Sequence, residues 1–383
     1  MSLKPLGIIS KNIDEGEETM LLSPSSRMFH EPNYNVYVLA IMGWKVPINV
    51  DSIKAELQSK MLKHPRFSSL QVMDDGGNMR WVPTTVNIDD HVIVPHLADN
   101  NVDKDELVED YISNLTTALF LKDSQTPFTT TQGFNASARQ RYIYRTVSLD
   151  DIKFIKDVTN AKVNDVVLGI TQAALSRYIH RRCGKGKFSL EGMRCRANVI
   201  VNLRPALGVQ AIAEIMIEKN VAVIQGNCFG FVLIPLSIGQ SENPLDYVYK
   251  AKTSMDRKKH SLESQCTLYA SQLFLNLFGF KGAAKLTQRV TSQTTVALSN
   301  VIGPREEISC AGHPLEFVAP TCSGYPTGIM VHVCSYANKL TFTIAVDEGI
   351  IPDLKQLGDD FIQSFMLIKE AAAHHTKLAT KLD

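Results

Sequence analysis

Runs of β-branched residues alternate with stretches of helical periodicity along most of this chain, and this alternation limits the folds open to it. Ile329–Tyr336 and residues 340–346 are separated by Ala-Asn-Lys, a pattern that predicts a β-hairpin. Pro352 then opens a stretch with apolar residues at helical spacing through Ile368. Because hairpins and helices follow one another in this way, we expect layered, mixed α/β domains rather than a purely parallel sheet.

The length of the chain bears on the number of its domains, and its net charge bears on the class of its partners. Its 383 residues, 44% of them hydrophobic, are enough for two domains with cores of their own. The 40 basic and 39 acidic residues leave a formal net charge of +1. Phosphate binding needs a concentrated basic excess, so we expect no nucleic-acid partner.

The cysteines indicate the redox environment of the chain, and the apolar runs indicate whether it contacts a membrane. The seven cysteines include no Cys-x-x-Cys pair and are odd in number, which favours a reduced environment over a disulfide framework or a metal site. No apolar run reaches eighteen residues, and the N-terminus lacks the apolar stretch of a secretory leader. Residues 268–280 predict a buried or amphipathic helix, with a helix resting on a membrane surface as the alternative. The basic residues of 181–187 predict a solvated loop, which could alternatively meet anionic headgroups or phosphates.

Further elements are expected before residue 150. Residues 35–42 are continuously apolar and predict a buried strand, Asp51 predicts a helix cap, and residues 74–78 predict a hairpin turn. Residues 86–94 predict another strand, and the polar residues 122–141 predict a surface linker.

A first motif, Val-Asn-Asp-Val at residues 163–166, opens a helical stretch. We expect Asn164 to cap that helix and Asp165 to lie in its first turn, where the helix dipole favours a carboxylate. This structural role explains both residues without any chemistry.

Two more motifs close predicted strands. Val-Asn-Leu-Arg-Pro at residues 201–205 places Asn202 and Arg204 at a strand end, where Arg204 is free to bind a carboxylate through two hydrogen bonds or to join a local network. Ser-Asn-Val-Ile-Gly-Pro at residues 299–304 joins Ser299 and Asn300 to a tight turn at Gly303. Such a turn can place polar side chains beside a reacting carbonyl, where they stabilise an oxyanion.

These three motifs occur together with Leu-Ser-Pro at residues 22–24 and Lys-His-Pro-Arg-Phe at residues 63–67. In this order they resemble the plant-type wax ester synthase/diacylglycerol acyltransferase family of the CoA-dependent acyltransferase superfamily. The resemblance implies two chloramphenicol-acetyltransferase-like domains, with boundaries at residues 1–121, a linker at 122–141 and residues 142–383. It places Asn164 and Asp165 near the active-site tunnel. In the superfamily an arginine pairs with the Asp of a His motif, so if Arg204 is that arginine, its partner is absent from this chain.

The resemblance also implies an activity. Family members transfer an acyl group from acyl-CoA, a co-substrate, to a long-chain alcohol or to diacylglycerol, giving wax esters or triacylglycerol. No bound cofactor and no metal are expected. The implied location is peripheral, at the cytosolic face of the endoplasmic reticulum or the plasma membrane, with a cytoplasmic location as the alternative.

One family motif does not occur in this chain. Acyl transfer to a hydroxyl needs a general base, which the family supplies from His-His-x-x-x-Asp-Gly. His374-His375, the one His pair, has no Asp-Gly after it, so we assign no catalytic residue and expect His332 to be packed or paired. The family sequence breaks off at Thr117 and resumes, beyond the motif, at Ala118. We therefore expect an incomplete N-terminal domain and a weak enzyme or, alternatively, a non-catalytic binding or regulatory relative or an unproductive splice form.

Overall fold

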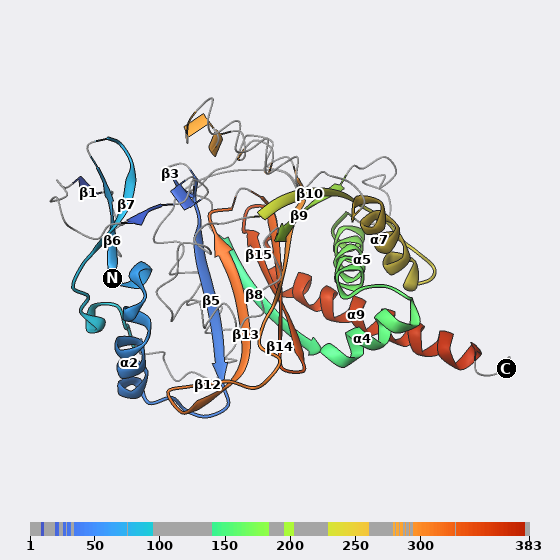
Figure 1. Ribbon diagram of the computed structural model, residues 1–383. Helices are drawn as coiled ribbons and strands as arrows, with labels where there is room; N and C mark the ends of the chain where they lie inside the picture. Colours follow the sequence, from blue (N-terminus) through green and yellow to red (C-terminus); the bar gives the residue numbers. More distant parts are fainter. Residues whose placement is uncertain are drawn as a thin grey trace.

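The computed structural model describes residues 140–183, 195–202, 229–259 and 294–379 apart from residue 326, and parts of 9–94 and 279–291. Within these ranges the chain forms a six-stranded sheet with helices on one face (Figure 1). A three-stranded sheet lies on the opposite face, and a small unit of strands and a helix lies beyond it. This confirms the mixed α/β fold.

The central sheet has the strand order β10-β9-β11-β14-β15-β8. The central strand β11 runs parallel to both β9 and β14, and the other neighbours are antiparallel. The hairpin predicted near residue 337 is confirmed as β14 and β15. The strands are β8 (Gln140–Ser148), β9 (Cys195–Asn202), β10 (Phe229–Leu236), β11 (Val296–Ile302), β14 (Ile329–Tyr336) and β15 (Lys339–Asp347).

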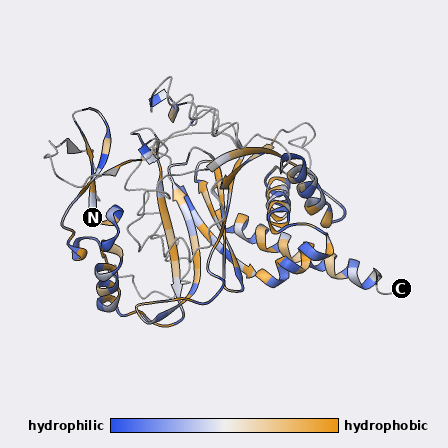
Figure 2. Ribbon diagram, viewed as in Figure 1, coloured by the Kyte–Doolittle hydropathy of each residue, from blue (hydrophilic) through white to orange (hydrophobic). Residues whose placement is uncertain are grey.

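Four helices cover one face of this sheet: α4 (Leu149–Val158), α5 (Val163–Cys183), α7 (Leu245–Lys259) and α9 (Leu354–Ala379). The caps follow from the sequence, because Ser148 accepts from the Asp151 amide at the start of α4. Apolar colour gathers where helices meet the sheet (Figure 2). The core there is built from alternate strand residues such as Val331 and Phe342 and from helix residues such as Phe361. Each such side chain contributes about 1.5–3 kcal/mol on burial.

A second layer packs on the other face of the sheet. It consists of β12 (Ser309–Cys310), β13 (His313–Ser323) and β5 (Tyr37–Trp44), in that order. Phe317 of β13 stacks on Tyr144 of β8, with ring centroids 4.8 Å apart. The strand predicted at residues 35–42 therefore exists, but the expectation that it is buried was wrong, because alternate residues of β5 face outward and are exposed.

The N-terminal unit contains a four-stranded sheet and the helix α2 (Val50–Ser59). The turn predicted at residues 74–78 joins β6 and β7 as expected. The cap of α2 is Asn49 rather than Asp51, and the strand predicted at 86–94 was wrong, since a 3-10 turn spans Ile88–Asp90 there. The strands are β1 (Ile9–Ser10), β6 (Ser69–Met73), β7 (Met79–Pro83) and β2 (Met20–Leu21), with a separate pair β3 (His30–Glu31) and β4 (Tyr34–Asn35).

Other expectations fall partly outside the described residues. The linker before residue 140, residues 268–278 and the Thr117–Ala118 junction belong to that part of the chain. The loop predicted to begin at residue 181 begins later, because Arg181 and Arg182 lie in the last turn of α5. Among the described helices, none has the length and the apolar composition needed to cross a bilayer.

Candidate functional site

The structure brings two of the three motifs into direct contact. Asn164, in the first turn of α5, accepts a hydrogen bond at Oδ1 from Nδ2 of Asn300 near the end of β11, at 2.6 Å. Asn300 is half-buried and Asn164 is exposed. The contact joins residues 136 positions apart in the sequence, so it ties the start of α5 to the carboxyl end of a central parallel strand.

The prediction that Asn164 caps α5 was wrong. The helix begins at Val163, and the capping contact comes from Asp165, whose carboxylate accepts from the Lys162 amide at 2.8 Å. The Asp165 amide in turn donates to the Lys162 carbonyl at 2.9 Å. Asp165 lies in the first turn as expected, where a carboxylate complements the helix dipole, and its side chain is buried. Asn164 is thereby left to bind Asn300.

Gly303 allows two backbone segments to approach each other closely. Its amide donates to the Ser335 carbonyl at 3.0 Å, and a Cβ at this position would lie 2.2 Å from that carbonyl oxygen. The next residue, Pro304, accepts from the Ala337 amide at 2.9 Å. The Gly-Pro pair therefore holds the end of β11 against the β14–β15 turn, and no side chain fits at position 303.

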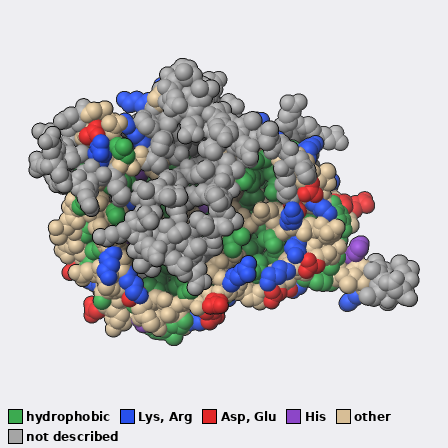
Figure 3. All heavy atoms as spheres, in the orientation of Figure 1, with side chains coloured by type: hydrophobic (Ala, Val, Ile, Leu, Met, Phe, Trp, Pro, Cys, Tyr) green, Lys and Arg blue, Asp and Glu red, His purple; other side chains and the backbone are tan. Residues whose placement is uncertain are grey.

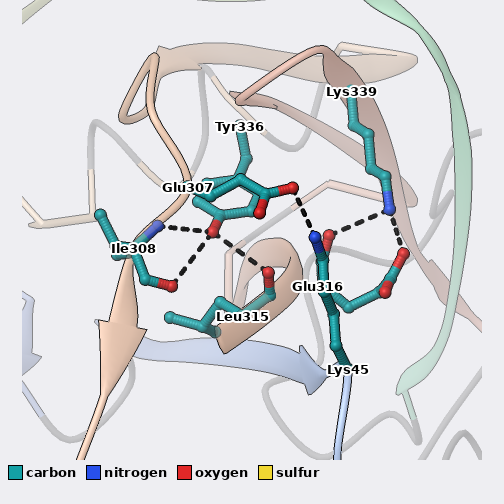
Figure 4. A network of polar contacts seen from close by, with 7 residues as sticks. All are labelled: Lys45, Glu307, Ile308, Leu315, Glu316, Tyr336 and Lys339. Carbon is teal, nitrogen blue, oxygen red and sulfur yellow. Dashed lines mark hydrogen bonds and ion pairs between the residues drawn. The ribbon is translucent and has the colours of Figure 1, made fainter. Parts of the chain in front are cut away.

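The segment after this turn is held by a polar network around Tyr336 (Figure 4). The buried Tyr336 hydroxyl accepts from the Ile308 amide at 2.9 Å and donates to the Leu315 carbonyl at 3.1 Å. Lys45 at the end of β5 pairs with Glu307, and Lys339 pairs with Glu316. The network thus fastens both β13 and β5 to the end of the sheet that carries the motifs.

Ser299 points to the other face of the sheet from Asn300, because strand residues alternate. Its Cα partner across β14 is His332, which is 9% exposed. Nδ1 of His332 lies 3.3 Å from the Thr321 hydroxyl of β13. Burial lowers the pKa of His332 to about 4, so the imidazole is neutral near pH 7. His332 is therefore packed and paired, as predicted.

Two buried polar residues, Asn198 of β9 and Thr321 of β13, were not predicted from the sequence. Asn198 of β9 is fully buried and donates from Nδ2 to the Tyr325 hydroxyl at 3.2 Å. Thr321 is buried beside His332. The signal for Asn198 was available, since a polar residue in an otherwise apolar alternating strand needs a partner when buried. Thr321 gave no such signal, because the position of β13 depends on pairing with β5.

The middle motif is only partly described. Asn202 ends β9, opposite Phe229 of β10. Because β9 and β11 are parallel, Asn202 and Asn300 lie toward the same edge of the sheet. Arg204 lies outside the described residues, so its partner stays a prediction. In the described ranges, no group of three or more His, Cys, Asp and Glu side chains gathers closely enough to hold a metal ion.

Comparisons with known proteins fit these motifs. Residues 225–369 match the family model of the WS/DGAT C-terminal domain. The chain is 31% identical to wax ester synthase/diacylglycerol acyltransferase 11 of Arabidopsis thaliana, covering 96% of this chain and 98% of the relative. The chain belongs to the wax ester synthase/diacylglycerol acyltransferase family. Wax ester synthase/diacylglycerol acyltransferase 6 of the same plant is 32% identical over 94% of each chain.

A solved structure supports the fold of this family member. The first condensation domain of the CDA synthetase is similar with a TM-score of 0.53, covering 92% of this chain and 96% of that one. At 11% identity, this likeness concerns the fold alone.

The alignment with acyltransferase 11 also shows that this chain is shorter than the aligned span. It extends over 477 positions, whereas this chain has 383 residues, so at least 94 aligned positions lie opposite gaps in this chain. Since 96% of this chain and 98% of the relative take part, these positions lie within the aligned span rather than beyond its ends.

Proposed function

We propose that this chain takes acyl-CoA and a long-chain alcohol or diacylglycerol as its ligands, and that it forms esters slowly because it lacks the general base. The observation that carries the proposal is the absence of His-His-x-x-x-Asp-Gly from this chain, in which at least 94 positions of the alignment with the Arabidopsis relative have no counterpart. A general base typically contributes about 10²- to 10⁴-fold in rate.

The described residues support ligand contact rather than proton transfer. The Asn164–Asn300 pair provides amide groups at the edge of the sheet where parallel strands end, a position that suits hydrogen bonds to a carbonyl or a hydroxyl. We assign Asn164 and Asn300 to the wall of the substrate tunnel, and Asp165, Gly303 and, from the other face of the sheet, Ser299 to its support. His332 is a poor base, because its low pKa weakens its affinity for the proton.

A second candidate function is a non-catalytic one. The absent motif favours a relative that binds the ligands, or an intact enzyme of the family, without turnover. For either function we propose peripheral contact with the cytosolic face of the endoplasmic reticulum or plasma membrane. The relatives' names indicate lipid products, which gather at membranes.

The deciding experiment measures acyl transfer from labelled acyl-CoA to a long-chain alcohol and, separately, to diacylglycerol. The purified chain is compared with a version in which the corresponding block of the Arabidopsis relative is inserted between Thr117 and Ala118. A third version carries the inserted block with the second His of the motif changed to Ala. We expect ester from the restored chain, and little from the other two. Turnover by the unaltered chain at the restored rate would refute the proposal.

Ligand binding by the unaltered chain is measured separately, by equilibrium dialysis with labelled acyl-CoA. We expect binding that Asn300→Ala weakens several-fold, with Asn338→Ala, whose amide bonds Asp150 away from the motifs, as the matched control. Equal loss in both variants, or no binding by the unaltered chain, would exclude a ligand role for Asn300.

A further inference from the structure

A cleft lies in the helical layer, between α5, α9 and the segment that leads from β10 into α7 (Figure 1). Its volume is about 850 Å³, within the about 300–1,000 Å³ that small-molecule sites occupy. None of its lining residues belongs to the three sequence motifs. Arg177, in its wall, is more than three turns farther along α5 than Asn164, or ~20 Å along the helix axis. The cleft is therefore separate from the Asn164–Asn300 site.

Two arginines of α5 approach one buried carboxylate in this cleft. Both oxygens of Asp360 accept from Arg181, at 2.7 Å each. Nε of Arg177 lies 3.9 Å from Oδ1 of Asp360, too far for a hydrogen bond. The guanidinium of Arg177 instead donates to the neutral side-chain amide of Gln363. Because Arg181 already uses both carboxylate oxygens, the positive charge of Arg177 is not matched by a hydrogen-bonded carboxylate.

The other lining groups are mostly neutral and polar. The side chain of Arg177 is 39% exposed, so its guanidinium is accessible from the cleft. The amide of Gln240 contacts the imidazole of His180 at 3.1 Å, and Gln356 lines the cleft from α9. Glu242, exposed on the segment before α7, is the remaining carboxylate among the lining residues. A guanidinium surrounded by amides suits a ligand that carries both an oxyanion and hydroxyl groups.

Two polar atoms of these walls have no hydrogen-bond partner within the described part of the chain. They are Nε of Arg177 and the hydroxyl of Ser364, a residue of α9 that is 1% exposed. Buried polar groups are normally paired, so a group without a partner beside a cleft indicates where a ligand would add a contact. A serine hydroxyl can rotate between staggered positions, which lets Ser364 turn toward a polar group that enters the cleft.

We propose that this cleft binds a small hydroxylated organic anion, whose phosphate or carboxylate group faces Arg177 and whose hydroxyl groups face the amides of Gln240 and Gln356. Arginine binds either oxyanion through two parallel hydrogen bonds. On the face seen in Figure 3, acidic and basic side chains are interspersed rather than gathered by sign. No broad positive field attracts anions to that face, so recognition depends on the groups inside the cleft.

Isothermal titration calorimetry of the purified full chain, at constant ionic strength, tests the binding. Glucose 6-phosphate, gluconate and glucose share a six-carbon skeleton but carry a phosphate, a carboxylate or no charge. We expect at least one of the two anions to bind with a dissociation constant of about 0.1–1 mM, and glucose to bind at least ~10-fold more weakly. The tighter anion identifies the preferred oxyanion. Failure of both anions to bind, or equal binding of glucose, would overturn the proposal.

Variants assign the binding to the cleft. Arg177→Met should weaken anion binding at least ~10-fold, because it removes the charge that faces the oxyanion. Arg257→Met, which removes an exposed arginine near the other end of α7, is the matched control and should bind like the parent chain. Asn300→Ala should also bind like the parent chain, which separates this site from the proposed substrate site. Equal affinities of the Arg177→Met and Arg257→Met variants would exclude the cleft.

Two further variants cover an Arg177→Met chain that fails to fold. Glu242→Gln removes the carboxylate that competes with the ligand, so it should tighten anion binding ~2- to 5-fold. Ser364→Ala removes a hydroxyl that has no partner in the described structure, so its urea midpoint should match that of the parent chain while anion binding weakens several-fold. Weaker binding by Glu242→Gln, or unchanged binding by Ser364→Ala, would contradict the proposed contacts.

Discussion

Ser335 and Gly303 approach each other too closely for any side chain at position 303, since a Cβ would lie 2.2 Å from the Ser335 carbonyl oxygen. We expect Gly303→Ala to lower the free energy of unfolding by about 1–3 kcal/mol, because β11 must shift away from β14. Urea unfolding measures the change. Gly76→Ala is the control, since the nearest atoms there are side-chain atoms 3.3 Å away rather than backbone. Equal losses in the two variants would contradict this account of the motif.

His332 makes stability depend on pH. Its pKa falls from the ordinary 6.5 to about 4 because burial disfavours the imidazolium. Between these values the unfolded chain binds a proton that the folded chain excludes, so stability present above pH 6.5 is lost as pH falls toward 4. By pH 4.5 the loss amounts to about 2–3 kcal/mol.

The variant that isolates this residue is His332→Gln, which keeps a polar group near Thr321 but does not titrate. Unfolding free energies at pH 7 and pH 4.5 are compared with those of the parent chain. We expect the pH-dependent loss to shrink by about 2–3 kcal/mol in the variant. An unchanged pH profile would show that His332 is protonated in the folded state.

The motif residues show how far single positions can be predicted. Asp165 lies in the first helical turn as expected, because that preference is local. Asn164 was assigned to the same local task, but its partner is Asn300, 136 residues away. Local propensity predicts the type of role a side chain can take, whereas a contact between distant segments depends on packing.

The helices α5 and α9 are joined by an ion pair between an exposed arginine and a buried carboxylate. Nη1 and Nη2 of Arg181 each lie 2.7 Å from one carboxylate oxygen of Asp360, which is 1% exposed. Arg181→Met should destabilise the chain by about 3 kcal/mol, because it leaves a buried carboxylate without its main partner. The double variant Arg181→Met/Asp360→Leu should recover most of that loss. A double-mutant cycle from thermal or urea unfolding measures it, and equal stability of single and double variants would contradict it.

This pair also explains why α5 runs farther than predicted. The sequence suggested a helix ending near His180 and a solvated basic loop after it. In the structure Arg181 binds Asp360 and Arg182 donates to the Ile350 carbonyl, so both continue the helix to Cys183. The strands of the β14–β15 hairpin were predicted well because turn and alternation are both local. The β5–β13 pairing was not, because its strands lie nearly 280 residues apart.

Apolar exposure is uneven over the molecule. The described residues before position 95 hold ten of the sixteen large hydrophobic residues that are exposed, and α2 buries none of its residues fully. Burial provides most of the stabilisation of a folded unit, so the N-terminal unit should be the less stable part.

Tryptophan fluorescence tests this difference directly. The chain has two tryptophans, Trp44 and Trp81, both before residue 95. In a Trp44→Phe variant the signal comes from Trp81 on β7 alone. We expect its urea midpoint to lie below that of the far-UV circular dichroism, which the larger sheet and helices dominate. Coincident transitions would show instead that the two units unfold together.

The strand order of the central sheet also has a consequence during synthesis. β8 pairs along its length with β15, and Gln140 and Asp347 at the ends of these strands are about 200 residues apart in the chain. At about 5–20 residues per second, a ribosome needs roughly 10–40 s to make that stretch. For this time β8 emerges without its partner, with Ile143 and Val147 open to neighbouring nascent chains. We therefore expect the yield of soluble protein to rise when chaperones that shield extended apolar segments are abundant.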